Sequence, residues 1–237
     1  MNNMAQSSRD QILNKLRSAR RVFEDAPPRP KTYLPVSPPV GEELHFKEAL
    51  LERFRHELEL LRAESFVVDG DAAARDLILG LLEEHQAKRI AAWHFAHIPV
   101  EHLYTAVEQA GYTVHYPRIH DSEFRAATLD RLESATVGLT GVDAAAATTG
   151  TLIVSTGEGK SRIPTILPPV HIAVLTMDQL LPRVEDWLKQ ERHTPSSVIH
   201  HSANICFISG PSRTADIEKQ LVLGVHGPGR LQVIIKR

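Results

Sequence analysis

Residues 65–93, "SFVVDGDAAARDLILGLLEEHQAKRIAAW", decide the fold, because they read as a strand, a helix and a second strand. "SFVVD" is a short run rich in β-branched and aromatic residues, which favour strands. Asp71 stands where it can cap the helix "AARDLILGLLEEH", and "RIAAW" is the next apolar run. Strands that alternate with helices in this way indicate a mainly parallel sheet with helices on both faces.

The alternation continues after this unit. Pro99 opens the predicted helix "PVEHLYTAVEQA", Gly111 ends it, and the strand "YTVHY" and a helix over residues 121–135 follow. The later strands, "TVGLTGV", "TLIVST", "HIAVL", "ICFIS" and "LQVIIK", have fewer helices between them. The sequence therefore predicts an α/β fold. In open sheets of this class, ligands lie beyond the carboxyl ends of the strands.

The N-terminal part of the chain has a different character and is expected to form a helical arm. Ser8 and Gln11 have the capping-box spacing, and a short apolar stripe follows at helical spacing (Ile12, Leu16, Ala19 and Phe23). Residues 26–39 are proline-rich and predict an extended connector. A second predicted helix has an apolar side (Phe46, Leu50, Phe54, Leu58 and Leu61). We therefore divide the chain into an arm, residues 1–62, and a main domain, residues 63–237.

Composition excludes several classes of function. The 237 residues include 27 basic and 29 acidic side chains, so the net charge of −2 gives no general attraction to nucleic acid or anionic membranes. No apolar run could span a bilayer and the first ten residues lack the apolar core of a signal peptide, so we expect a cytoplasmic protein. Cys206 is the only cysteine, which excludes an internal disulfide and an iron–sulfur cluster held by this chain alone. No zinc site is predicted, because no cysteine or carboxylate completes a set with His94, His97 and His102.

The stretch "VDAAAATTGTLIVST" has the highest density of groups that could bind an anion. Asp143 is followed by four alanines, and Thr149, Gly150 and Thr151 then precede an apolar strand. Backbone amides and hydroxyls in such a turn suit a carboxylate or phosphate. The alternative is a tight turn whose threonines bond to their own backbone.

The next loop, "STGEGKSR", resembles a phosphate-binding loop but lacks its requirements. Val154 stands where the first glycine should be, and Pro164 prevents a helix directly after the lysine. The loop carries Lys160 and Arg162, which are either solvated charges or the cations of a mobile flap that closes over an anion. His171 follows two prolines at the start of an apolar strand, where it is either a hydrogen-bonded structural residue or a functional one.

The C-terminal stretch "ISGPSRTADIEKQLVLGVHGPG" predicts a helix from Pro211 to about Leu223, with Gly210 before it. Free amides, the helix dipole and the side chains at the N-terminus of that helix would bind an anion (Ser212, Arg213 and Thr214). Proton transfer would fall to the titratable residues nearby (Asp216, Glu218 and His226). A glycine on either side of His226, one of them Gly227, indicates that the backbone passes close to another group.

Three stretches, "GLTGVDAAAATTGTLIVSTGEG", "LPPVHIAVL" and "ISGPSRTADIEKQLVLGVHGPGRLQVII", resemble the LutC/YkgG family, the lactate utilization protein C group of LUD-domain proteins. The resemblance covers most of residues 65–237. It implies a Rossmann-like three-layer sandwich of the NagB/RpiA/CoA-transferase-like type. It also implies a role in oxidising L-lactate to pyruvate beside LutA-like and LutB-like iron–sulfur partner proteins. Thr148 departs from the family, whose members commonly have glutamate at this position. If that glutamate acts as a general acid or base in the relatives, Thr148 cannot replace it in this chain.

Three functions remain open at this point. The chain could be an accessory subunit of a lactate-oxidising complex that binds a small carboxylate or phosphate-bearing ligand. It could instead be a stand-alone isomerase or acyl-transfer enzyme, with Asp143, Glu158 or Glu218 as base or nucleophile. It could also be a non-catalytic assembly subunit that docks through its arm. The expected ligand-binding residues are Asp143, Thr149, Gly150, Thr151, Arg162, His171, Gly210, Ser212, Arg213, Thr214 and Gly227.

Overall fold

The computed structural model describes residues 8–19, 46–117, 125–215 and 221–237. The chain divides into two compact units, residues 1–39 and residues 40–237. In the first unit, helix α1 (Ser8–Ala19) has Asp10 in its first turn and Arg17 in its last, which suits the helix dipole. Its apolar side chains Ile12 and Leu16 are exposed. The rest of the fold belongs to the second unit.

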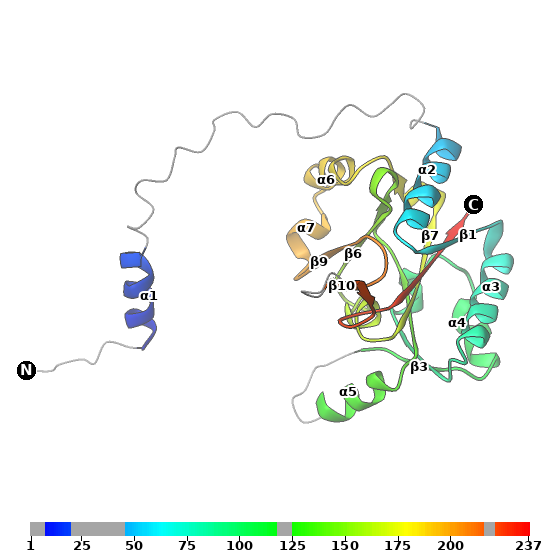
Figure 1. The fold of residues 1–237 in the computed structure, drawn as a ribbon, viewed down its shortest axis with the longest axis horizontal. Helices are drawn as coiled ribbons and strands as arrows, with labels where there is room; N and C mark the ends of the chain where they lie inside the picture. The colour runs from blue at the N-terminus through cyan, green and yellow to red at the C-terminus, as the bar shows by residue number, and fades with distance from the viewer. Residues whose placement is uncertain (1–7, 20–45, 118–124, 216–220) are drawn as a thin grey trace, which may run out of the picture. The chain divides into compact units, whose positions relative to one another are not determined.

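The main sheet has six parallel strands in the order β1-β12-β7-β4-β2-β3, which confirms the predicted α/β fold (Figure 1). Because parallel neighbours need crossover connections, the strands come from distant parts of the sequence. Their bounds are Glu64–Val68 (β1), Arg89–Ala92 (β2), Thr113–His115 (β3), Val137–Gly141 (β4), Val170–Thr176 (β7) and Arg230–Lys236 (β12).

Helices flank this sheet, and Figure 1 shows α3 and α4 together at one side of it. The helices are α2 (Lys47–Leu60), α3 (Gly70–Glu84), α4 (Leu103–Gln109) and α5 (Arg125–Glu133). Helix α2 buries Leu50, Leu51, Phe54 and Leu58, so it packs into the core of the second unit. The sequence assigned this helix to the arm, whereas the structure divides the chain between residues 39 and 40.

A second, mixed sheet has the order β8-β5-β6-β9 and contains two of the later predicted strands, "TLIVST" and "ICFIS". Its strands are β5 (Ala144–Ala146), β6 (Thr151–Ser155), β8 (Leu180–Leu181) and β9 (Ile205–Ile208). Helices α6 (Val184–Arg192) and α7 (Val198–His201) lie beside it in Figure 1. Short 3-10 turns connect the elements: η3 (Phe95–His97), η4 (Ala147–Thr149), η5 (Ile163–Thr165) and η6 (Met177–Gln179).

The helix predicted from Pro211 to Leu223 is wrong. Strand β10 (Arg213–Ala215) pairs antiparallel with β11 (Leu221–Leu223), and residues 216–220 lie outside the described part of the chain. Two backbone hydrogen bonds hold this ribbon, Ser212 N to Pro228 O at 2.8 Å and Gly224 N to Ser212 O at 3.0 Å. These hydrogen bonds join residues 12 to 16 positions apart, and they replace the i to i−4 bonds of the helix that the local sequence predicted.

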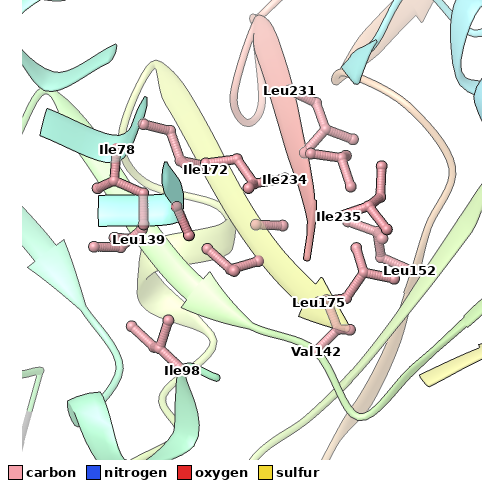
Figure 2. Packing of buried hydrophobic residues seen from close by; sticks show 14 of the residues in the cluster. Ile78, Ile98, Leu139, Val142, Leu152, Ile172, Leu175, Leu231, Ile234 and Ile235 are labelled. Atoms are coloured by element: carbon pink, nitrogen blue, oxygen red, sulfur yellow. The ribbon is translucent and has the colours of Figure 1, made fainter. Parts of the chain in front are cut away.

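One apolar core joins the two sheets. Residues of the main sheet, such as Leu139, Ile172 and Ile234, pack in one cluster with Leu152 of the small sheet and Ile78 of helix α3 (Figure 2). Their side chains are fully buried. Burial of this size fixes the angle between the sheets and therefore the shape of the space between them.

Candidate functional site

A pocket of about 240 Å³ lies between the main sheet and the small sheet. His171 and Leu231, near the amino ends of β7 and β12, form one wall, and the end of β9 with the turn after it forms the other. The described residues that line it are Thr165, Ile166, His171, Phe207, Ile208, Ser209, Gly210, Pro211, Ser212, His226, Gly227, Pro228 and Leu231. No aspartate, glutamate, lysine or arginine occurs among these lining residues.

Five of the residues predicted to form a site line this pocket although they are up to 56 positions apart: His171, Gly210, Ser212, His226 and Gly227. Ser209 and Thr165 were not predicted, and they add two hydroxyls to the lining. Ser209 could have been found, because it directly follows a strand, where ligand-binding residues gather. Asp216 and Glu218, predicted as proton-transfer residues, lie outside the described residues.

His171 forms part of the pocket wall as a neutral imidazole. The side chain is 1% exposed, and Nε2 lies 2.8 Å from Oγ1 of Thr140, which is also buried. Loss of water around the ring lowers the pKa of His171 from 6.5 to about 4, because burial disfavours the charged form. At pH 7 the imidazole therefore offers one hydrogen-bond donor and one acceptor, and no charge.

A chain of hydroxyls leads from turn η4 to the pocket. Thr149 Oγ1 lies 2.7 Å from Thr151 Oγ1, which lies 2.8 Å from Oγ of Ser209. Thr151 is 4% exposed and does not line the pocket. The threonines predicted as direct ligands therefore lie behind Ser209, and Thr151 fixes the position of its hydroxyl.

Arg213, Gly150 and Gly210 all lie against the C-terminal end of helix α2. Arg213 donates a hydrogen bond from Nη2 to the backbone oxygen of Leu61, one of the carbonyls that a helix end leaves unpaired. Both glycines have positive φ, and a Cβ atom on either would lie within 3.0 Å of Leu61. Close packing against α2 therefore explains these residues without a ligand. Thr214 lies in β10, outside the pocket lining.

Asp143 is not among the described residues that line the pocket. Its carboxylate lies 2.5 Å from Nζ of Lys160 and accepts a hydrogen bond from the amide of Ser155. The same ammonium lies 2.9 Å from Ser155 Oγ and 5.3 Å from the centre of the Trp93 ring. Both side chains of the ion pair are only 15% exposed, so Lys160 is held inside the protein and not on a flap. Arg162 is exposed and does not line the pocket.

The carboxyl ends of β2 and β4, where a ligand was expected, are covered by this same loop. His94 donates its amide hydrogen to Gly159 O at 2.8 Å, and Trp93 Nε1 donates to Ser161 O at 2.8 Å. The pocket instead lies near the amino ends of two main-sheet strands, because the segments that enter β7 and β12 leave space beside β9. Within the described ranges, no three His, Cys, Asp or Glu side chains are placed to hold a metal, and no helix is long and apolar enough to cross a membrane.

Comparison with known proteins places this fold and these motifs in a family. The LUD domain model matches residues 51–235. Lactate utilization protein C of an Exiguobacterium species is 32% identical over 189 residues, which cover 80% of this chain and 78% of that protein. Lactate utilization protein C of Halalkalibacterium halodurans is 31% identical over 159 residues, 65% of each protein. The crystal structure of a DUF162 family protein from Deinococcus radiodurans has a similar fold, with a TM-score of 0.57, 24% identity and coverage of 81% of this chain and 99% of that one. The chain therefore belongs to the LUD domain family, in the lactate utilization protein C group.

Proposed function

We propose that this protein is an accessory component of an L-lactate utilization system and binds a small anionic ligand in the pocket between its sheets. The system would oxidise L-lactate to pyruvate with LutA-like and LutB-like iron–sulfur proteins as partners. The observation that carries the proposal is the convergence of three separate motif segments on one pocket. The relatives named lactate utilization protein C support the metabolic context.

The lining favours a small monocarboxylate over a phosphate ester. Ser209 and Ser212 offer hydroxyls, His171 offers a neutral ring nitrogen, and His226 offers the ring nitrogens of an exposed imidazole. Phe207 and Leu231 supply apolar surface for a short carbon chain. A phosphate dianion would ordinarily require lysine or arginine, and the described residues of the lining include neither. The volume is below the range of about 300–1,000 Å³ typical of drug-sized ligands.

Oxidation of lactate releases two electrons, which this chain has no cysteine set to receive. Cys206 is its single thiol, and an iron–sulfur cluster requires several ligands. Electron transfer is therefore assigned to clusters on the partner proteins. A stand-alone isomerase or acyl-transfer enzyme is less well supported, because the described lining contains no carboxylate and Asp143 is paired with Lys160.

The test is thermal stability of the purified chain with L-lactate, D-lactate, pyruvate, phosphate, ribose 5-phosphate and coenzyme A. A ligand that binds only the folded state raises Tm by mass action. We expect L-lactate or pyruvate to raise Tm, and His226→Ala to reduce the shift. His201→Ala is the matched control, because His201 is exposed and outside the pocket. A shift with coenzyme A or the sugar phosphate alone would support the enzyme alternative, and no shift with either acid would contradict the proposal.

A further inference from the structure

Large apolar side chains surround the mouth of the pocket. In the described parts of residues 40–237, nine such side chains are exposed, and six of them belong to the three segments that form or adjoin the pocket: Ile166, Leu167, Phe207, Val222, Leu223 and Val225. Their exposed fractions run from 39% to 51%. We call these six side chains the mouth face. A concentration of this kind marks an interaction surface, because single exposed apolar residues are normally scattered.

The three segments are in direct contact around the pocket, and one side of the β10–β11 ribbon extends this surface, since the consecutive strand residues Val222 and Leu223 point to opposite sides. Ile166 and Phe207 both line the pocket. A Cβ atom on Gly227 would lie 3.2 Å from Ser212 Cβ and 3.8 Å from the backbone oxygen of Ile166. The ribbon that carries Val222 and Leu223 is joined to Ser212 by the amide of Gly224. A partner that covers the apolar side chains would therefore also cover the pocket.

In the described parts of the three segments, the charged side chains are arginines, whereas Asp216 and Glu218, in the connection between β10 and β11, lie outside the described residues. Residues 162–171, 205–214 and 222–230 contain no aspartate or glutamate, whereas they contain Arg162 and Arg213. Both arginines are exposed, and the bond from Arg213 to a backbone oxygen does not neutralise its charge. Arg230 is the exception, because Glu64 and Glu84 neutralise it. A complementary surface is apolar at its centre and acidic at its edge.

Redox chemistry defines the partner further. Under the proposed function, the electrons of lactate oxidation pass to iron–sulfur clusters on the partner proteins, since Cys206 is the only thiol of this chain. The pocket opens at the mouth face, so an electron acceptor placed there would lie nearest to the ligand. We propose that the mouth face is the docking surface for an iron–sulfur partner with an acidic, apolar patch, which closes the pocket when it binds. This inference rests on the proposed function and adds the surface and the charge of the partner.

The experiment measures binding of the full chain to the purified iron–sulfur proteins of lactate utilization from the same organism, without oxygen. Leu167→Glu and Val225→Glu place acids on the mouth face outside the pocket lining, and Arg162→Glu reverses a charge at its edge. Leu60→Glu is the matched control, because Leu60 is 63% exposed at the end of α2, outside the mouth face. We expect each mouth-face variant to weaken binding by about tenfold or more. We expect Leu60→Glu to bind like the unchanged chain, and 0.5 M salt to weaken binding of the unchanged chain.

Folding of each variant is checked by its Tm and by its Tm shift with L-lactate. Mouth-face variants that are folded and bind the partners as tightly as Leu60→Glu would overturn the inference and leave the proposed function intact. An unchanged chain that binds neither iron–sulfur protein would overturn both. The alternative partner for the mouth face is a second copy of the chain, and analytical ultracentrifugation tests whether the chain forms such a dimer. A dimer that Val225→Glu dissociates, with partner binding unaffected, would assign the mouth face to self-association and overturn the inference.

Discussion

At the scale of single residues, two largely buried side chains have to keep a defined protonation state. His171 must remain neutral in the pocket wall, and Lys160 must remain charged beside Asp143. Both states depend on neighbours that the sequence separates, Thr140 in the first case and Asp143 in the second. Each state gives a measurable dependence of the free energy of unfolding on pH or on substitution.

His171 should make the protein less stable as pH falls from about 6.5 to about 4. In this window the unfolded chain takes up a proton that the folded chain excludes, so the free energy of unfolding decreases by up to about 1.4 kcal/mol per pH unit. Above pH 6.5 the His171 imidazole is neutral in both the folded and the unfolded chain, so its effect on the free energy of unfolding no longer changes with pH. His171→Gln should flatten this part of the stability–pH curve in urea denaturation. His201→Gln should leave the slope unchanged, and an equal slope in all three proteins would contradict the prediction.

Lys160→Met should destabilise the fold by about 3 kcal/mol, because it leaves the mostly buried carboxylate of Asp143 without its cation. Adding Asp143→Asn should recover part of that loss, since the charge that needs a partner is then removed. A double-mutant cycle by urea denaturation measures the coupling. Additive effects of the two substitutions would show that the ion pair is not coupled.

Thr151→Val should reduce ligand binding although Thr151 does not line the pocket. The substitution keeps the shape of the side chain and removes the hydroxyl that holds Ser209 and Thr149. We expect a Tm shift with L-lactate that is at least about half lost, together with a loss of stability of about 1–2 kcal/mol. Thr194→Val is a control, because Thr194 lies in an exposed turn after α6. An unchanged Tm shift with L-lactate in Thr151→Val would mean that Ser209 binds the ligand without a hydrogen bond from Thr151.

At the scale of elements, helix α2 organises the turns that contain the most distinctive glycines. Gly150 and Gly210 belong to different sheet connections, yet both pack on Leu61. Arg213 then binds the carbonyl of the same residue. The sequence motif around Gly210 therefore combines two roles, contact with α2 on one side and the pocket wall on the other.

Arg213→Ala should lower the free energy of unfolding by about 1 kcal/mol, the value of a partly exposed hydrogen bond to a charged group. Because its guanidinium is bound to α2 and not to the pocket, the Tm shift with L-lactate should persist. Arg162→Ala provides a comparison at an exposed arginine outside the pocket lining. If Arg213→Ala abolished the Tm shift with L-lactate, Arg213 would have to be assigned to the ligand-binding site after all.

The elements that could be predicted are those whose signals are local. Apolar runs separated by amphipathic helices identified the parallel sheet, since each crossover leaves a helical pattern in the sequence. The ribbon of β10 and β11 was missed because Pro211 and Gly224 occupy positions typical of helix ends, whereas Pro228, which bonds Ser212, is 16 residues away. In the site, His171, Ser212 and His226 could be predicted from unusual local sequence. Ser209 could not be recognised from residue type alone.

At the scale of the whole molecule, the division at residue 39 predicts which truncations are tolerated. Removal of residues 1–39 should leave Tm within a few degrees of the full chain, because the described core of the second unit begins with Leu50 in helix α2. Removal of residues 1–62 should prevent stable folding, since it takes away Phe54 and Leu58, both 0% exposed. Circular dichroism melting of the two truncated chains decides between the two boundaries. Equal stability of both would favour a boundary at residue 62.

The order of the main sheet also determines when the chain can fold during its synthesis. Strand β1 pairs with β12 alone, in a register that joins Glu64 to Gln232 and Val68 to Lys236. Strand β12 lies between β1 and β7, so these neighbours have no common partner until residues 230–236 have left the ribosome. Until then β1 and one edge of β7 lack their partner strand, although β7, β4, β2 and β3 can already pair with one another. An unpaired apolar strand edge favours aggregation and engagement by chaperones. Slow translation of the codons just before those of β12 would lengthen this interval, and a stop codon before residue 230 would yield a chain that cannot close its sheet.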